Sequence, residues 1–231
     1  MTYVPPTDNP SPEKLAEFEK TDPARALVEY ANRNQVADVQ RMLDNGVNPD
    51  TRVLFDIGFE KIAETALCTA AANGHVDVAK ALIAGGASLE FTSEVEFTPL
   101  LNAAAASQPD MVRFLVNAGA DMAAREESFG QTPLHKAARL GFMPCVVALV
   151  ELGADRGVYD NAGLRPQDMI CLQAGGKPEA REKVREEILE VFLRAELRDA
   201  VAAQRYADEL ANAPVLQRNL KPLKPVRFGR G

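Results

Sequence analysis

The stretch that decides the fold is TPLHKAARLG at residues 132–141, which is closed by Gly153-Ala154-Asp155. The same layout recurs as TALCTAAANG at residues 65–74 and as TPLLNAAAAS at residues 98–107. In each copy the leading Thr stands 21 residues before a Gly, and successive copies begin 33 or 34 residues apart. A fixed period of this length indicates a repeat architecture, in which each unit buries its apolar face only against its neighbours.

Each period predicts two short helices joined by a sharp turn. The leading Thr is a favoured N-cap residue, and Pro99 and Pro133 fit the first turn of a helix, where their missing N–H costs nothing. The turn is expected at Asn34, Gly74, Ser107 and Gly141. A positive φ there favours Gly and then Asn, so Ser107 is the poor fit. Apolar pairs that we expect to fill the seam between repeats are Leu82-Ile83, Leu115-Val116 and Leu149-Val150.

The TPLHxAA pattern at this step resembles the ankyrin repeat. The resemblance implies an all-α solenoid of stacked helix-turn-helix units joined by β-hairpin-like loops. It also implies that His75 and His135 form hydrogen bonds to backbone or Thr groups between repeats. Partners of such proteins meet the concave side, which is made of the hairpin tips and the exposed face of the first helices.

The period also sets the expected domain organisation. Residues 1–21 are interpreted as a loose arm with a short helix that begins at Ser11-Pro12. The repeats are expected at about residues 22–54, 60–92, 93–126 and 127–159, with a partial repeat at 160–176, a long C-terminal capping helix at 177–212 and a basic Pro-containing tail at 213–231. The loop at 50–64 is about seven residues longer than the others, and its segment Val53–Phe59 predicts an extended β-finger.

Composition restricts the location and the class of partner. No run of about 18 apolar residues exists, and the first residues lack the basic and apolar regions of a signal peptide, so a cytoplasmic location and no membrane contact are expected. Cys68, Cys145 and Cys171 fall in segments predicted to be helical and are expected to be small core residues. The net charge of −7 argues against nucleic-acid binding by the body, whereas the tail carries five basic and no acidic residues.

No residue pattern predicts catalysis. Two distant histidines without Cys or His at metal-ligand spacing do not make a zinc site, and no phosphate-binding loop or nucleophile elbow is present. We therefore expect no catalytic residue, no metal and no cofactor.

Transfer of the ankyrin binding surface to this chain predicts fourteen partner-binding residues. They are Lys61, Ile62, Glu64, Asn73, Glu94, Val95, Phe97, Ser128, Phe129, Gln131, Arg139, Leu140, Asn161 and Leu164. Several are large and apolar, and an exposed row of them would suit a protein partner. The alternative is that Val95 and Phe97 pack between the hairpins.

These patterns predict a non-catalytic interaction module or adaptor that binds another protein. An alternative is a dedicated inhibitor or immunity-type protein that blocks an enzyme through an acidic surface. The tail has further interpretations besides disorder: a Pro-x-x-Pro ligand at Pro222–Arg227, docking on an acidic surface, or contact with nucleic acid. The C-terminal helix is longer than a capping helix needs to be, which leaves room for self-association.

Overall fold

The structure, a computed structural model, describes residues 10–56, 61–92, 97–172 and 177–212. Its elements, in chain order, are α1 (Pro12–Thr21), α2 (Pro23–Asn32), α3 (Val36–Asp44), β1 (Val53–Asp56), β2 (Lys61–Glu64), α4 (Ala66–Asn73), α5 (Val76–Ala84), α6 (Pro99–Ala105), α7 (Pro109–Asn117), α8 (Pro133–Leu140), α9 (Met143–Glu151), the 3-10 helix η1 (Pro166–Met169) and α10 (Pro178–Asn212). The chain divides into two units, one up to Leu193 and one from Arg194 onward.

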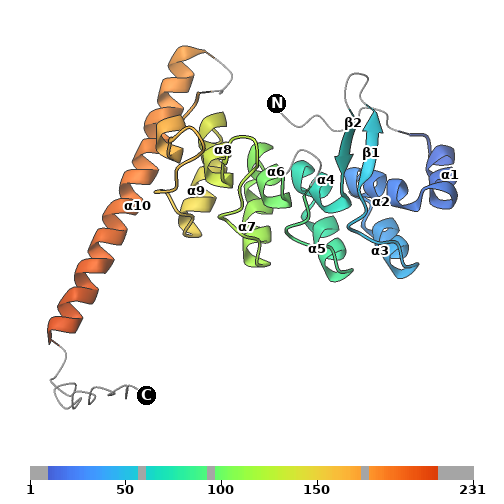
Figure 1. The fold of residues 1–231 in the computed structure, drawn as a ribbon, viewed down its shortest axis with the longest axis horizontal. Coiled ribbons are helices and arrows are strands. Elements are labelled where there is room, and N and C mark those ends of the chain that lie inside the picture. Colours follow the sequence, from blue (N-terminus) through green and yellow to red (C-terminus); the bar gives the residue numbers. More distant parts are fainter. Residues whose placement is uncertain (1–9, 57–60, 93–96, 173–176, 213–231) are drawn as a thin grey trace, which may run out of the picture. The chain divides into compact units, whose positions relative to one another are not determined.

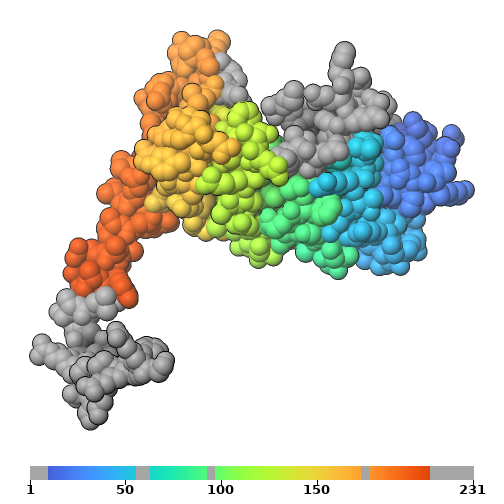
Figure 2. Space-filling view, viewed as in Figure 1, coloured from blue at the N-terminus to red at the C-terminus, as the bar shows by residue number. Residues whose placement is uncertain are grey.

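The first unit is a stack of helix pairs. The first helices α2, α4, α6 and α8 pack in order along one row, and the second helices α3, α5, α7 and α9 pack along a second row (Figure 1). In the space-filling view the repeats follow one another as adjacent slices from blue to yellow (Figure 2). The predicted ankyrin-type solenoid is therefore confirmed.

Local capping explains where the first helices begin. The hydroxyl of the leading Thr accepts a hydrogen bond from the N–H three residues later, in Thr65 to Cys68 at 3.2 Å and in Thr98 to Leu101 at 3.3 Å. Each such Thr has extended backbone angles, as an N-cap requires. Replacing one of these caps by Ala typically costs about 1 kcal/mol.

The turns between paired helices adopt the left-handed conformation that the sequence predicts. Gly74 and Gly141 have φ of 72° and 74°, and Asn34 and Ser107 both have φ of 58°. Ser107 thus takes the same conformation as the glycines although its Cβ makes that conformation less favourable. The turn is set by stacking on both sides and not by the preference of this one residue.

Small and branched residues fill the core between repeats. The alanine pairs of the first helices are fully buried, as are Leu82, Leu115 and Leu149 of the second helices. Full burial of such a leucine stabilises the fold by about 1.5–3 kcal/mol before the entropy of ordering is subtracted. The close approach of neighbouring first helices depends on the small alanine side chains.

The long loop after the first repeat forms two antiparallel strands. β1 pairs with β2 from Val53 opposite Glu64 to Asp56 opposite Lys61. This agrees with the predicted β-finger, of which residues 57–59 lie outside the described residues. Phe55 of β1 is buried, and the Arg25 guanidinium lies 5.4 Å from the centre of its ring. The finger is thereby attached to the first repeat.

The first helix of the fifth repeat is shorter than its sequence suggests. Its first helix is only the four-residue η1, and the backbone then enters the left-handed region at Cys171, with φ of 59°. The prediction of Cys171 within a helix is therefore wrong, because the chain turns immediately after η1. Cys68, Cys145 and Cys171 are all buried free thiols, as expected for core residues.

The C-terminal helix α10 extends from Pro178 to Asn212. On this helix Ile188 and Phe192 are buried, whereas Val184 and Val191 are half-buried. Within the described part of the chain, no helix combines the length and the apolar character needed to cross a membrane. The tail at 213–231, with its Pro-x-x-Pro segment, lies outside the described residues.

Candidate protein-interaction surface

The hairpin tip of the fourth repeat is fixed by its own backbone. The N–H of Glu126 donates to the carbonyl of Gln131 at 3.2 Å, and the N–H of Gly130 donates to the carbonyl of Glu126 at 2.9 Å. Gly130 has φ of 65° and lies so close to Asn161 that a Cβ there would meet its side-chain oxygen at 2.3 Å. Glycine is therefore strongly favoured at this position of the tip.

A buried ion pair supports the same tip from below. The Lys136 ammonium lies 2.6 Å from Glu126 Oε1, and both side chains are only 4% exposed. The ammonium also lies 4.6 Å from the ring centre of Phe97 and 6.0 Å from that of Phe129. Burial lowers the pKa of Lys136, while Glu126 opposes that shift. The ion pair attaches the tip to α8.

Phe129 projects from this fixed tip into solvent. Its side chain is 56% exposed, and its carbonyl accepts a hydrogen bond from the N–H of Asn161 at 2.9 Å. This bond links the tips of the fourth and fifth repeats. An exposed aromatic ring on a rigid turn loses little conformational entropy when a partner covers it.

Tyr159 stands on the neighbouring tip and is equally exposed, at 56%. The guanidinium Nη1 of Arg125 donates to its carbonyl at 2.9 Å, which fixes the backbone here as well. Tyr159 is not among the partner-binding residues predicted from the sequence, and its equivalent one repeat earlier, Glu126, is buried. The available signal was an aromatic residue within a polar hairpin segment.

The predicted partner-binding residues divide into four groups by exposure. Ser128, Phe129 and Asn161 are exposed, and Asn73, Phe97, Arg139, Leu140 and Leu164 are half-buried. Glu64 and Gln131 are buried. The side chains of Lys61 and Ile62 and the whole of Glu94 and Val95 lie outside the described residues.

The structure does not support a surface position for Glu64 and Gln131. Gln131 Nε2 donates to Asp160 Oδ2 at 3.4 Å and lies 3.7 Å from Met169 Sδ, so its amide is used between repeats. Phe97 is half-buried, and the Lys136 ammonium of α8 lies 4.6 Å from its ring centre. The predicted continuous apolar row is therefore reduced, among the described residues, to Phe129 flanked by partly covered neighbours.

The histidines serve the stack, as the resemblance implied. His75 Nδ1 donates to the carbonyl of Ala31 in the preceding repeat at 2.9 Å. His135 Nε2 donates to the carbonyl of Leu164 in the following repeat at 3.1 Å, so its Nδ1 accepts from the Thr132 hydroxyl at 2.8 Å. Burial lowers the pKa of His135, which keeps this neutral tautomer. In the described part of the chain, no three His, Cys, Asp or Glu residues are grouped as a metal ion would require.

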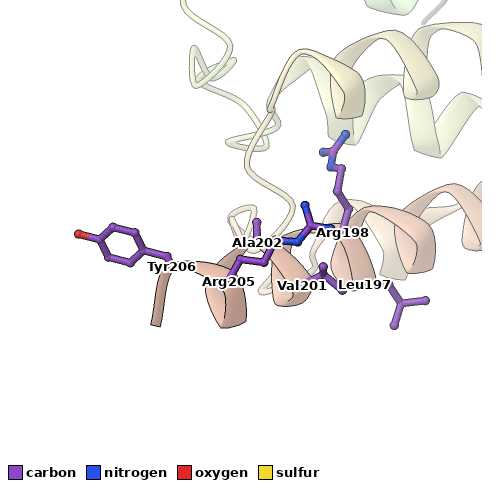
Figure 3. A pocket seen from close by; sticks show the side chains of 6 residues that line it. All are labelled: Leu197, Arg198, Val201, Ala202, Arg205 and Tyr206. Atoms are coloured by element: carbon purple, nitrogen blue, oxygen red, sulfur yellow. The ribbon is translucent and has the colours of Figure 1, made fainter. Parts of the chain in front are cut away.

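The second unit carries a separate exposed face on α10. Leu197, Arg198, Val201, Ala202, Arg205 and Tyr206 line a shallow pocket along this helix (Figure 3). Leu197, Val201 and Tyr206 are each more than half exposed. The mixture of apolar and arginine side chains differs from the acidic character of the chain as a whole.

A stack of paired short helices joined by loops defines the class of helical repeat proteins. Comparison with known proteins identifies the class more closely. Ankyrin repeats (3 copies) match residues 27–126, and ankyrin repeats (many copies) match residues 100–155. The chain belongs to the ankyrin-repeat family, whose repeats are generally protein–protein interaction modules.

Several curated proteins are similar over part of their length. The ankyrin repeat and KH domain-containing protein mask-1 of Caenorhabditis elegans is 33% identical over 135 residues, which are 56% of this chain and 5% of that protein. The glycerophosphocholine phosphodiesterase GDE1 of Candida albicans is 38% identical over 76 residues, covering 33% of this chain and 6% of that protein. The bovine ankyrin repeat domain-containing protein 37 is 33% identical over 98 residues, covering 42% and 61%. This chain spans less than two thirds of each.

Proposed function

We propose that this protein is a non-catalytic interaction module that binds a protein partner through the tips of its fourth and fifth repeats. This tip surface consists of Ser128, Phe129, Tyr159 and Asn161. The half-buried Arg139 and Leu140 at the end of α8 extend it along the first-helix face. The observation that carries the proposal is an exposed Phe129 on a turn that a buried ion pair holds in place.

The chemistry of the tip surface suits a protein partner. Phe and Tyr are enriched at the cores of interfaces, because each buries a large area with few rotatable bonds. The exposed part of the Phe129 ring makes no packing contact within the repeat. Burial of this part of the ring by a partner is therefore a net gain of apolar contact. The fixed backbone of both tips reduces the entropic cost of that contact. Lys61, Ile62, Glu94 and Val95 belong to the wider surface expected from the sequence.

The test compares captured proteins between matched variants. Phe129→Ser combined with Tyr159→Ser removes both aromatic rings, while Leu172→Ser removes an apolar side chain of similar exposure, 61%, outside the tip surface. We expect the double variant to lose a protein that the wild type and Leu172→Ser both retain, in quantitative mass spectrometry of affinity purifications from the native cell. All variants should unfold at nearly the same temperature. Equal retention by all three would exclude the tip surface as the binding site.

A further inference from the structure

Part of α10 is not covered by any other element of the described chain. Every residue from Glu196 to Asp208 is exposed. A helical segment of this length is marginal in water by itself, because most helical stability in proteins comes from the packing of an apolar face. Leu197 and Val201, which are 59% and 53% exposed, lie one turn apart on this segment (Figure 3). A second element that covered these two side chains would therefore stabilise the helix.

Val201 stands at the centre of one face of this segment. At about 100° per residue, seven residues complete almost two turns, so Arg194, Val201 and Asp208 lie nearly in line. Phe192, nine positions before Val201, lies on the opposite side of the helix and is buried. The face centred on Val201 therefore points away from the buried side of α10. We define the Val201 face as Arg194, Leu197, Arg198, Val201, Arg205 and Asp208.

The charge of the Val201 face changes sign along the helix. Arg194 and Arg198 stand on its N-terminal half, and Asp208 stands at its C-terminal end. Gln204 Nε2 donates to Asp208 Oδ1 at 2.8 Å, which holds the carboxylate at this end. Such a face is complementary to an antiparallel copy of itself, because the basic half of one copy then meets the acidic end of the other. A parallel copy would bring like charges together.

We propose that two copies of this protein associate through their Val201 faces, with the two helices antiparallel and Val201 at the two-fold axis. Residues equally far from Val201 in opposite directions then face each other. Arg194 of one copy meets the partner's Asp208, and this contact occurs twice because a two-fold interface is isologous. Leu197 and Val201 of both copies form the apolar centre.

Arg205 is compatible with this arrangement. It stands opposite the partner's Leu197, where the aliphatic stem of an arginine covers apolar surface while the guanidinium stays in water. An acidic helix of a different protein is the other occupant that the arginines would attract. Such a helix would repel Asp208, whereas a second copy pairs both signs of charge.

Val201→Cys tests the position of the two-fold axis in the full-length protein. Oxidised glutathione should convert this variant to a disulfide-linked dimer, seen on non-reducing gels, because the two thiols meet across the axis. Ala203→Cys, at an exposed residue on the other side of the helix, is the matched control and should stay monomeric. The native cysteines are buried, and the wild type measures their contribution. No more dimer from Val201→Cys than from Ala203→Cys would overturn the proposal.

Charge exchange tests the antiparallel direction. Arg194→Glu should raise the dimer dissociation constant at least about tenfold in sedimentation equilibrium, because like charges then face each other. Asp208→Arg should do the same, and the two substitutions together should restore the wild-type value. Both side chains are exposed, so the variants should unfold at the wild-type temperature. An unchanged dissociation constant in both single variants, or no recovery in the combined variant, would overturn the proposal.

The wild type supplies the remaining measurement. We expect its average mass in sedimentation equilibrium to rise with concentration from that of a monomer toward that of a dimer. A wild type that stays monomeric up to its solubility limit would overturn the proposal and would favour an acidic partner instead. These measurements use no other protein, so they succeed or fail independently of the tip-surface variants.

Discussion

Replacement of Lys136 by Met tests whether the buried ion pair organises the fourth hairpin tip. The side chains of Lys136 and Glu126 are each 4% exposed, and their charged atoms are 2.6 Å apart. Met preserves most of the apolar stem of Lys136 but leaves the Glu126 carboxylate buried without its counter-ion. Breaking a buried pair in this way costs about 3–5 kcal/mol. The free energy of unfolding, measured by urea denaturation at pH 7 with circular dichroism, should fall by that amount.

A second variant separates the ion pair from a general loss of packing. Lys136→Met combined with Glu126→Leu removes both charges, and a well-packed apolar replacement of a buried pair is often neutral or stabilising. We expect the double variant to recover to within about 1 kcal/mol of the wild type. The reasoning is refuted if the single variant loses less than about 1 kcal/mol, or if the double variant is no more stable than the single one.

Three further predictions concern the stack. Glu64→Gln should remove a pH dependence of stability, because the pKa of the Glu64 carboxyl is 4.5 in the unfolded chain and about 7 in the folded one. The wild type therefore loses stability as the pH rises through this window, by roughly 3 kcal/mol in full, and the variant does not. Urea denaturation at pH 4.5 and pH 8 measures the difference. Ser107→Gly should raise the free energy of unfolding by about 0.5–1 kcal/mol in thermal melts, because φ is 58° there. Phe97→Ser should cost about 2 kcal/mol in the same melts while Phe129→Ser costs less than about 0.5, because Phe97 is half-buried with Lys136 at 4.6 Å from its ring centre, whereas Phe129 is 56% exposed.

Each of these has a contradicting outcome. The same stability difference between wild type and Glu64→Gln at both pH values would show that Glu64 does not titrate as described. A lower melting temperature for Ser107→Gly would mean that the serine side chain stabilises the turn. Equal losses for the two phenylalanine variants would place Phe129 in the packed interior and remove it from the tip surface.

The elements that could be predicted from the sequence are those determined by local interactions. The signals of the first helix all lie within ten residues: a Thr cap, a Pro in the first turn and a left-handed residue at the end. The structure of the stretch from Thr132 to Gly141 is therefore determined by residues within it. The long loop also followed, since its extra apolar segment from Val53 to Phe59 favours an extended hairpin over a solvated loop. The reduction of the fifth unit did not follow, because Pro166 begins a helix as Pro99 and Pro133 do, and the chain turns only at Cys171.

Whether a candidate site residue is exposed depends on contacts between repeats more than on local sequence. Glu64 and Gln131 occupy the same place in the period as Phe97, and whether that place is open depends on the residue facing it from the next repeat. Phe97 is half-covered because a lysine 39 positions later bends over it. Tyr159 is 56% exposed, whereas Glu126, at the equivalent place one repeat earlier, is buried. Such relations between distant positions are not visible in one period of sequence.

Site-specific photo-crosslinking tests the interaction surface most directly. A photoreactive phenylalanine analogue placed at Phe129, at Tyr159 or, as control, at Leu172 reports which protein lies against each position in the native cell. The tip surface predicts adducts with one and the same protein from positions 129 and 159, and no adduct with that protein from position 172. Adducts with a partner from position 172 alone, with none from 129 or 159, would contradict it.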